Sequence, residues 1–263
     1  MTDPMTEPAL HLWADRLEET IRRNGVRVID RVRVLAETGS TQDAARLAAG
    51  DRPGLMVTAG RQSSGRGRLG RAWADSAHLG VAVTFVVEAR SAGVLSIAAG
   101  LASCRACAAF LAAPSALGLR WPNDVVEFRG AQRKVSGVLI EETDRLALVG
   151  IGINVLHRDA DWSEALRGRA VSLAQLGAGV SRLEVLERLT IELDRALAEP
   201  AEALARAWTG LDILRGSVRT FVHDGREHTG EVVSIDPAGE IVLRTTAGAV
   251  VTLPAVSTSL RHE

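Results

Sequence analysis

Hydrophobic positions recur along the chain with two different periods, and each period predicts a different kind of element. Apolar residues spaced three or four apart predict helices, while alternation and short β-branched runs predict strands. The expected helices are residues 8–24, 41–50, 91–113 and most of 161–210. The expected strands are residues 32–37, 55–60, 80–88, 134–142 and 145–155. This mixture predicts an α+β or mixed α/β architecture for the first 210 residues.

The pattern changes near residue 211. Short β-type runs are separated there by turn sequences at residues 224–225, 236–239 and 247–248. Strands at this spacing, joined by glycine-containing turns, are typical of a small antiparallel barrel or sandwich. We therefore expect a large unit of residues 1–211 followed by a small β unit of residues 212–263.

Composition narrows the class of protein. The chain is 46% hydrophobic and 24% charged, which is ordinary for a globular protein, and its net charge of -1 gives no footprint of a nucleic-acid-binding protein. No apolar run approaches the roughly 18 residues that span a bilayer. The acidic first residues also lack the basic-then-apolar order of a signal peptide. We expect a cytoplasmic protein that contacts neither membrane nor DNA.

The two cysteines, Cys104 and Cys107, lie three residues apart in an alanine-rich run. A CxxC pair can be redox-active or half of a zinc site, but the chain has no second CxxC and no nearby histidine cluster. We expect two small buried residues on one helix.

One basic residue stands apart from the others. Lys134 is the only lysine among the 31 lysines and arginines of the chain. Arginine cannot replace lysine where a compact ammonium must fit, because the guanidinium is broad, planar and forked. A chance survivor is the alternative, but we expect Lys134 to have a functional role.

Residues 65–70 match the GxGxxG pattern of dinucleotide-binding proteins through Gly65, Gly67 and Gly70. That motif requires a helix directly after the glycines, so that the pyrophosphate meets the helix N-terminus. The residues that follow lack helical periodicity and lead into another strand. The sequence therefore argues against a Rossmann site.

The same loop carries four arginines, Arg61, Arg66, Arg68 and Arg71. Glycines let backbone N–H groups approach an anion closely, and arginines bind carboxylates or phosphates with two hydrogen bonds. Because like charges this close repel one another, we expect the loop to be mobile until an anionic ligand binds. A solvated basic loop is the alternative, and a nucleic-acid contact is less supported because no aromatic residues are interleaved.

Five motifs occur in order, and together they resemble the biotin protein ligase family. They are ETGSTQD at 37–43, GRQSSGRGRLGRAW at 60–73, RWPNDV at 120–125, RKVSGVLIE at 133–141 and VGIGINV at 149–155. The resemblance covers about residues 35–156. It implies a catalytic domain with a class II synthetase-like mixed sheet and a small SH3-like C-terminal β-barrel. It also implies formation of biotinyl-5'-AMP from biotin and ATP, and transfer of biotin to a lysine of an acceptor protein.

The resemblance also implies roles for individual residues. Lys134, Arg66 and Arg68 would be catalytic. The biotin site would contain Ser40, Thr41, Gln42, Gln62, Gly65, Arg66, Gly67, Arg68, Lys134 and Gly137. The ATP and adenylate site would contain Arg68, Arg71, Trp73, Arg120, Asn123, Asp124, Ser136 and Asn154. Asp124 would also hold Mg²⁺, directly or through water.

The chemistry explains the demand for cations. When a carboxylate attacks a phosphate, two anions meet and negative charge builds on the α-phosphoryl oxygens. A fixed ammonium and guanidinium offset the repulsion and stabilise that charge. The family position of Lys134 thus agrees with its being the only lysine.

Some positions depart from the family pattern or have simpler explanations. Gln42 stands where the family usually has asparagine, and Arg120 stands where a lysine is more common. Helix capping is the alternative for Ser40 and Thr41, and core packing is the alternative for Trp73. An exposed turn is the alternative for Asn123 and Asp124, and ease of strand packing is the alternative for Gly150 and Gly152.

The resemblance implies a biotin carboxyl carrier protein or domain as acceptor, docked beside the active site through an exposed sheet edge. Only about 37 residues precede Gly39, which leaves room for a helix and a strand but not for the three-helix DNA-binding domain of many family members. We expect no repressor function, and the chain to be a monomer or a homodimer. The rival functions are a lipoate protein ligase and a non-catalytic biotin-binding module.

Overall fold

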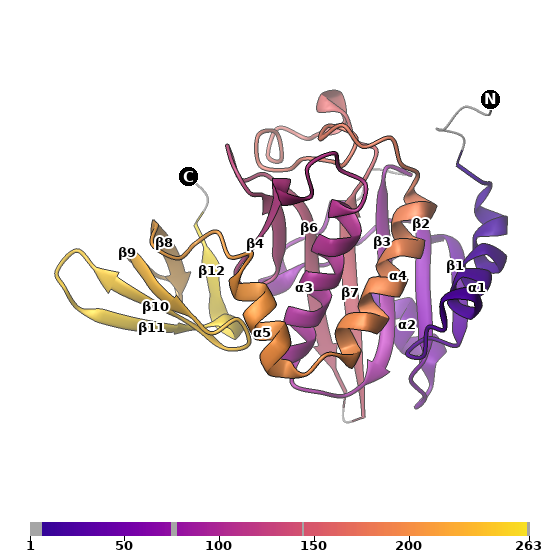
Figure 1. Ribbon diagram of the computed structural model, residues 1–263, viewed down its shortest axis with the longest axis horizontal. Helices are drawn as coiled ribbons and strands as arrows, with labels where there is room; N and C mark the ends of the chain where they lie inside the picture. The colour runs from indigo at the N-terminus through magenta and orange to yellow at the C-terminus, as the bar shows by residue number, and fades with distance from the viewer. Residues whose placement is uncertain (1–6, 75–77, 144, 262–263) are drawn as a thin grey trace.

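The computed structural model describes residues 7–74, 78–143 and 145–261. Its centre is a seven-stranded mixed sheet with the order β1-β2-β3-β7-β6-β5-β4 (Figure 1). The strands are β1 (Arg31–Thr38), β2 (Leu55–Gln62), β3 (Gly80–Glu88), β4 (Leu117–Arg120), β5 (Asp124–Glu127), β6 (Lys134–Glu142) and β7 (Leu146–Asn154). Only the β1–β2 pair is parallel, because α2 (Thr41–Ala49) carries the chain from one of these strands to the next.

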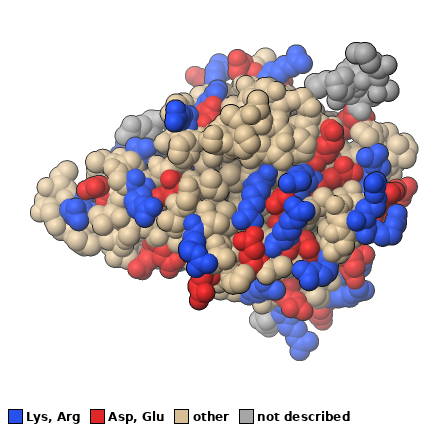
Figure 2. Space-filling view, viewed as in Figure 1, with Lys and Arg blue, Asp and Glu red and all other residues tan. Residues whose placement is uncertain are grey.

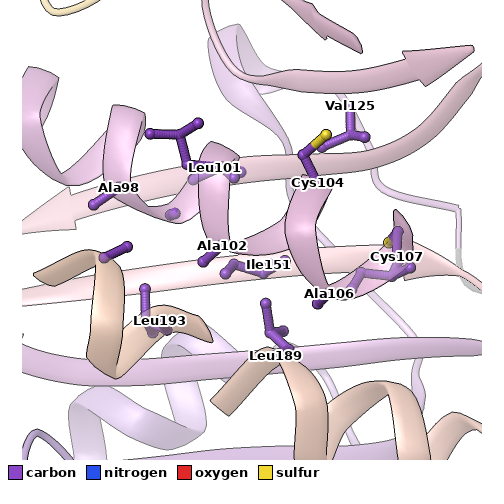
Figure 3. Packing of buried hydrophobic residues seen from close by; sticks show 14 of the residues in the cluster. Ala98, Leu101, Ala102, Cys104, Ala106, Cys107, Val125, Ile151, Leu189 and Leu193 are labelled. Atoms are coloured by element: carbon purple, nitrogen blue, oxygen red, sulfur yellow. The ribbon is translucent and has the colours of Figure 1, made fainter. Parts of the chain in front are cut away.

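One face of this sheet is covered by α3 (Ala92–Ala108) and α4 (Arg182–Ala198), with α5 (Ala201–Thr209) beside α3 (Figure 1). Alanines let the two long helices approach closely: Ala102 and Ala106 of α3 lie beside Leu193 and Leu189 of α4 (Figure 3). Helix α3 is buried between α4 and the sheet, so nearly every side of it faces apolar residues. Its sequence is therefore apolar all round and shows little amphipathic contrast.

Alternate residues of β2 point to opposite faces of the sheet. Met56 belongs to the large core under α3 and α4, whereas Leu55 and Val57 pack with Ala45 and Ala49 of α2 in a second, smaller core. Helix α2 therefore lies on the face opposite to α3. It covers only part of that face, and the uncovered part beyond its N-terminus carries the site described below.

The N-terminal segment packs at the β1 edge of the sheet. It contains η1 (Leu10–Leu12) and α1 (Trp13–Asn24), and α1 ends at Gly25, whose φ of 63° is the left-handed conformation of a helix stop. Arg182, at the start of α4, forms an ion pair with Glu7 and lies over the Trp13 ring. These contacts attach residues before β1 to a helix that begins at Arg182.

The C-terminal part is an antiparallel sheet of five strands with the order β11-β10-β9-β8-β12. Its strands are β8 (Val218–His223), β9 (Arg226–Ile235), β10 (Glu240–Thr245), β11 (Val250–Pro254) and β12 (Thr258–Leu260). The expected turns at 224–225, 236–239 and 247–248 each join two of these strands. Phe221 meets Trp121 edge to face at 6.1 Å between ring centroids, so the two sheets share apolar contacts.

The α+β class is confirmed, but two expected helical regions are wrong. Helix α3 ends at Ala108 rather than near Pro114, because bonds from Phe110 and Leu111 to carbonyls three residues back tighten and end it. Residues 162–181 form turns and loops rather than a helix. Two backbone hydrogen bonds hold that segment beside β6 instead. The Lys134 N–H donates to the Arg169 carbonyl, and the Val171 N–H donates to the Lys134 carbonyl.

The cysteines behave as small core residues, as expected. Cys104 and Cys107 are buried, free thiols on α3, and Cys104 lies close to Val125 of the sheet (Figure 3). Burial raises the pKa of the Cys104 thiol to about 12, so it stays protonated and unreactive near neutral pH.

The surface carries both signs of charge. Basic and acidic side chains are interspersed over the face that α3, α4 and α5 form (Figure 2). In the part of the chain that the structure describes, no helix is both long enough and apolar enough to cross a bilayer.

Candidate active site

A cavity of about 600 Å³ opens on the sheet face beyond the N-terminus of α2, and it reaches the C-terminal sheet. Its size suits a small-molecule ligand. Most of the residues expected from the motifs line it: Ser40, Thr41, Gln42, Gln62, Arg66, Gly67, Arg68, Arg71, Trp73, Arg120, Asn123, Asp124, Lys134, Gly137 and Asn154. Gly65 is not in the lining, but its carbonyl accepts a hydrogen bond from the backbone N–H of Trp73 at 2.9 Å.

Ser136 is brought elsewhere. Its hydroxyl is fully buried and lies 2.7 Å from the hydroxyl of Ser103 on α3, in the layer between sheet and helix. The structure therefore gives Ser136 a packing role and no contact with the cavity. The motif KVSG could not reveal this, because a bulge between β5 and β6 changes which side chains share a face.

A neutral hydrogen-bonding pocket forms where α2 begins. Ser40 caps the helix, because its hydroxyl accepts a hydrogen bond from the backbone N–H of Gln42, so the capping alternative holds for it. Thr41 donates from its backbone N–H (2.7 Å) and its hydroxyl (3.0 Å) to Oε1 of Gln62, while its hydroxyl accepts from Thr84 at 2.9 Å. These bonds hold the amide of Gln62 and the hydroxyl of Thr41 in place at the inner end of the cavity.

Gln42 extends this pocket. Its Nε2 donates to the Leu139 carbonyl at 3.2 Å, while its Oε1 is buried and has no hydrogen-bond partner among the described residues. A Cβ on Gly150 would lie 2.9 Å from Gln42 Nε2, so the glycine leaves room for this longer side chain. A buried acceptor without a donor is costly, which suits a ligand that brings an N–H group.

The floor of the cavity is a patch of sheet without side chains. Gly137 and Gly152 are cross-strand partners on β6 and β7, and the Trp73 ring lies directly on them. A Cβ on Gly152 would be 2.4 Å from two ring carbons, and a Cβ on Gly137 would be 3.3 Å from another. The Lys134 side chain lies closer still to Gly137, with Nζ 2.6 Å from such a Cβ. The glycines thus do more than ease strand packing: they make room on the sheet for the Trp73 ring and the Lys134 side chain.

A cluster of charges lies beside Gly137, where Lys134 approaches the floor. Lys134 Nζ is 2.6 Å from Asp124 Oδ1, and Arg120 donates to Asp124 Oδ2 at 2.9 Å. Burial by itself would raise the pKa of Asp124, but the charges and hydrogen bonds of Lys134 and Arg120 outweigh it and hold the pKa at about 2. Two cations therefore share one carboxylate, and the cluster keeps a net positive charge. Lys134 Nζ also lies 5.4 Å from the centre of the Trp73 ring.

Arg68 joins the glycine loop to the C-terminal sheet. Its guanidinium donates to the main-chain carbonyl of Ala255, in the short connection η5 (Ala255–Ser257) between β11 and β12. Burial lowers the pKa of Arg68, yet arginine stays protonated throughout the ordinary pH range. Since its hydrogen-bond partner is neutral and the nearby Asp124 is already shared by Lys134 and Arg120, Arg68 adds positive charge to the cavity.

The other loop arginines differ in their partners. Arg61 lies 3.7 Å from Glu37. Arg66 donates to the carboxylates of Asp43 and Glu141, which both lie outside the loop. Among the described residues, Arg71 has no carboxylate within ion-pair distance. Carboxylates elsewhere in the chain therefore offset part of the repulsion among the loop arginines. Mobility of the empty loop stays a prediction.

Two asparagines support the site through the backbone. Asn123 donates to the Val138 carbonyl and accepts the backbone N–H of Val138 on its own carbonyl. Asn154 donates to the Lys134 carbonyl at 3.0 Å. The polar turn at RWPND is thus tied to β6, which sets the place of Asp124 against Lys134.

Sequence reasoning missed two walls of the cavity. One wall is the irregular segment after β7, through Trp162, Leu166 and Arg169, and the other is the C-terminal sheet, through Leu260 and Arg261. Neither wall carries a motif that could have revealed it. Trp162 is backed by His157, whose ring stacks on it at 4.3 Å.

The residues present do not fit a Mg²⁺ ion held directly by Asp124. Both of its oxygens are bound by cations, so a metal ion would have to displace Lys134 or Arg120. Binding of Mg²⁺ through water stays a prediction. The geometry makes Asp124 the partner that places Lys134.

Comparison with known proteins decides the family. The biotin/lipoate A/B protein ligase family matches residues 35–156. A biotin–[acetyl-CoA-carboxylase] ligase of Mycobacterium tuberculosis is 36% identical over 224 residues, which are 80% of this chain and 82% of that protein. The chain belongs to the biotin/lipoate A/B protein ligase family.

Other members of the biotin/lipoate ligase family agree. A biotin–[acetyl-CoA-carboxylase] ligase of Paracoccus denitrificans is 32% identical over 82% of this chain and 95% of that protein. The solved structure of a biotin protein ligase from Aquifex aeolicus, in complex with biotin and ATP, superposes with a TM-score of 0.76 and 27% identity. It covers 89% of this chain and 100% of that chain, so the similarity extends beyond the ligase-family segment 35–156.

Proposed function

We propose that this protein is an ATP-dependent biotin protein ligase, which forms biotinyl-5'-AMP and pyrophosphate and then transfers biotin to a lysine of a biotin carboxyl carrier domain. The observation that carries the proposal is one cavity that joins a neutral amide pocket to a net positive charge cluster across a glycine floor. The ligase relatives and the biotin- and ATP-bound neighbour support it.

The two ends of the cavity suit the two ends of biotin. The ureido ring offers two N–H donors and one carbonyl acceptor, which match Gln42 Oε1 and the hydroxyls of Ser40 and Thr41. The valerate chain is apolar and slender, and it would run past the Trp73 ring through the cavity. Its carboxylate would then reach Lys134.

In the first reaction a carboxylate oxygen of biotin attacks the α-phosphorus of ATP, and the bond from that phosphorus to the pyrophosphate oxygen breaks. Lys134, held by Asp124, and Arg68, held by Ala255, bring positive charge to the place where the two anions meet. Arg71 has no carboxylate partner among the described residues and adds a third cation for the phosphates. Proximity of the two substrates supplies much of the remaining acceleration.

In the second reaction the amine of the acceptor lysine attacks the acyl carbon, and AMP leaves with the bond electrons. The carrier domain would dock at the cavity mouth, beside the glycine loop and η5. We further propose that residues 1–211 form the catalytic unit and residues 212–263 a small β unit, whose role includes holding Arg68 through Ala255.

The test is biotin-dependent exchange of labelled pyrophosphate into ATP by the native chain and by Lys134→Gln, followed by transfer of labelled biotin to a purified carrier domain. Exchange that requires biotin and falls by orders of magnitude in the variant supports the proposal. Exchange with lipoate in place of biotin would assign the chain to the other branch of the family. The absence of exchange with either acid would leave only a binding protein.

A further inference from the structure

Arg66 was expected to be a catalytic cation, but its surroundings differ from those of the other cavity cations. Its guanidinium donates two hydrogen bonds to Asp43 on α2, at 2.5 and 2.8 Å, one to each carboxylate oxygen. It also donates to Glu141 on β6 at 3.2 Å. Glu141 in turn accepts from Arg46 of α2 at 2.7 Å. Two arginines and two carboxylates thus form a connected row, in the order Arg46, Glu141, Arg66 and Asp43.

The charges of this network cancel within the protein. Lys134 and Arg120 share a single carboxylate, and Arg68 binds a neutral carbonyl, so these groups retain positive charge for an anionic ligand. Arg66 retains none, because Asp43 and Glu141 balance it together with Arg46. The hydrogen bond to Asp43, and then the charge of Glu141, raise the pKa of Arg66. The same hydrogen bond to Arg66 lowers the pKa of Asp43, as expected of a committed pair.

The position of Arg66 in the loop shows what the network does. Residues 65–73 fold into a tight hairpin, in which Arg66 pairs with Ala72 and the Gly67 N–H donates to the Arg71 carbonyl at 2.7 Å. Leu69, at its tip, is one of the few non-glycine residues with positive φ, at 55°. A short hairpin with so few apolar contacts needs an anchor, and Arg66 attaches it to α2 and to β6 at once.

We propose that Arg66 is a positioning residue, which with Asp43 and Glu141 anchors the glycine loop so that Arg68, Arg71 and Trp73 face the ligand. It does not itself stabilise the reacting anions. The kinetic part of this inference rests on the proposed ligase function, whereas its structural part does not.

The partners of Arg66 make the proposal testable, because they lie outside the loop and Asp43 is not part of the cavity lining. Asp43→Asn and Glu141→Gln should each raise the KM for biotin and ATP about three- to tenfold, the modest effect expected of partly exposed ion pairs. The kcat of pyrophosphate exchange should change less than about twofold. Arg66→Gln should behave alike, and Asp43→Asn/Arg66→Gln should be no worse than Arg66→Gln alone.

A catalytic Arg66 predicts the opposite pattern. Removal of Asp43 would then free a cation and leave exchange unchanged or faster, while Arg66→Gln would lower kcat by orders of magnitude. That result would overturn the proposal. Glu37→Gln is the matched control, because Glu37 forms the looser 3.7 Å pair with Arg61 beside the same loop, and it should leave the kinetics unchanged.

A second measurement needs no catalysis. Hydrogen exchange of the peptide that covers residues 60–73 should become several-fold faster in Asp43→Asn and Arg66→Gln, but not in Glu37→Gln, with the α3 and α4 peptides unchanged. Unaltered loop exchange in Asp43→Asn would overturn the anchoring role even if the chain had no ligase activity. Fast loop exchange without biotin-dependent activity would instead leave the anchor standing and remove the proposed function.

Discussion

Gly152→Ala is the sharpest test of the glycine floor. An added Cβ would lie 2.4 Å from the Cε2 and Cζ2 atoms of Trp73, whereas carbon atoms in contact are about 3.5–4.0 Å apart. The ring must therefore move by about 1 Å or more, into the cavity that the ligand would occupy. Such crowding costs about 1–3 kcal/mol, which corresponds to roughly a 5- to 150-fold loss of affinity for biotin.

The expected loss should appear in binding rather than in folding. Gly152 has no positive φ, and its added methyl would face the cavity rather than the core, so the fold should tolerate alanine. The assay is the KM for biotin in pyrophosphate exchange, together with urea denaturation of the same samples. Gly179→Ala is the control, because a Cβ there meets nothing within 4 Å and Gly179 also lacks a positive φ. A biotin KM that stays within about twofold of the native value would refute this role of Gly152.

Three further predictions concern other residues. Lys134→Gln should lower pyrophosphate exchange about 10²–10³-fold. Lys134→Arg should restore little of this loss, because the broader guanidinium does not fit between Asp124 and the Trp73 ring. Near-native exchange in Lys134→Arg would contradict this. Ser136→Ala should cost about 1 kcal/mol of unfolding free energy, since it removes the hydrogen bond between the buried Ser136 and Ser103 hydroxyls, but it should not change KM. A changed KM at unchanged stability would return Ser136 to the binding site. Burial lowers the pKa of His157 to about 4 from its ordinary 6.5, so below neutral pH the unfolded chain binds a proton that the folded chain does not. The unfolding free energy should therefore fall by about 1.3 kcal/mol between about pH 7.5 and about pH 5.5, and less in His157→Gln; equal slopes in urea denaturation would exclude this cause.

The sequence alone determined the element types where the pattern was long and local. Strand β3 was expected at its observed bounds, α1 ends at Gly25 as expected, and the turns of the C-terminal sheet lie at their glycines. Motif order also located most of the cavity lining, and the single lysine marked Lys134. These features depend on neighbours within a few residues, where period and turn chemistry decide the backbone.

Tertiary structure alone decided which charges act on the ligand. Nothing in the loop sequence separates Arg66 from Arg68, yet one meets two carboxylates from α2 and β6 and the other meets a carbonyl nearly 190 residues away. The same holds for Ser136, which a bulge turns toward α3. The sequence shows which side chains carry a charge. Whether that charge can act on a ligand depends on the oppositely charged groups within a few ångströms, and only the fold brings those groups together.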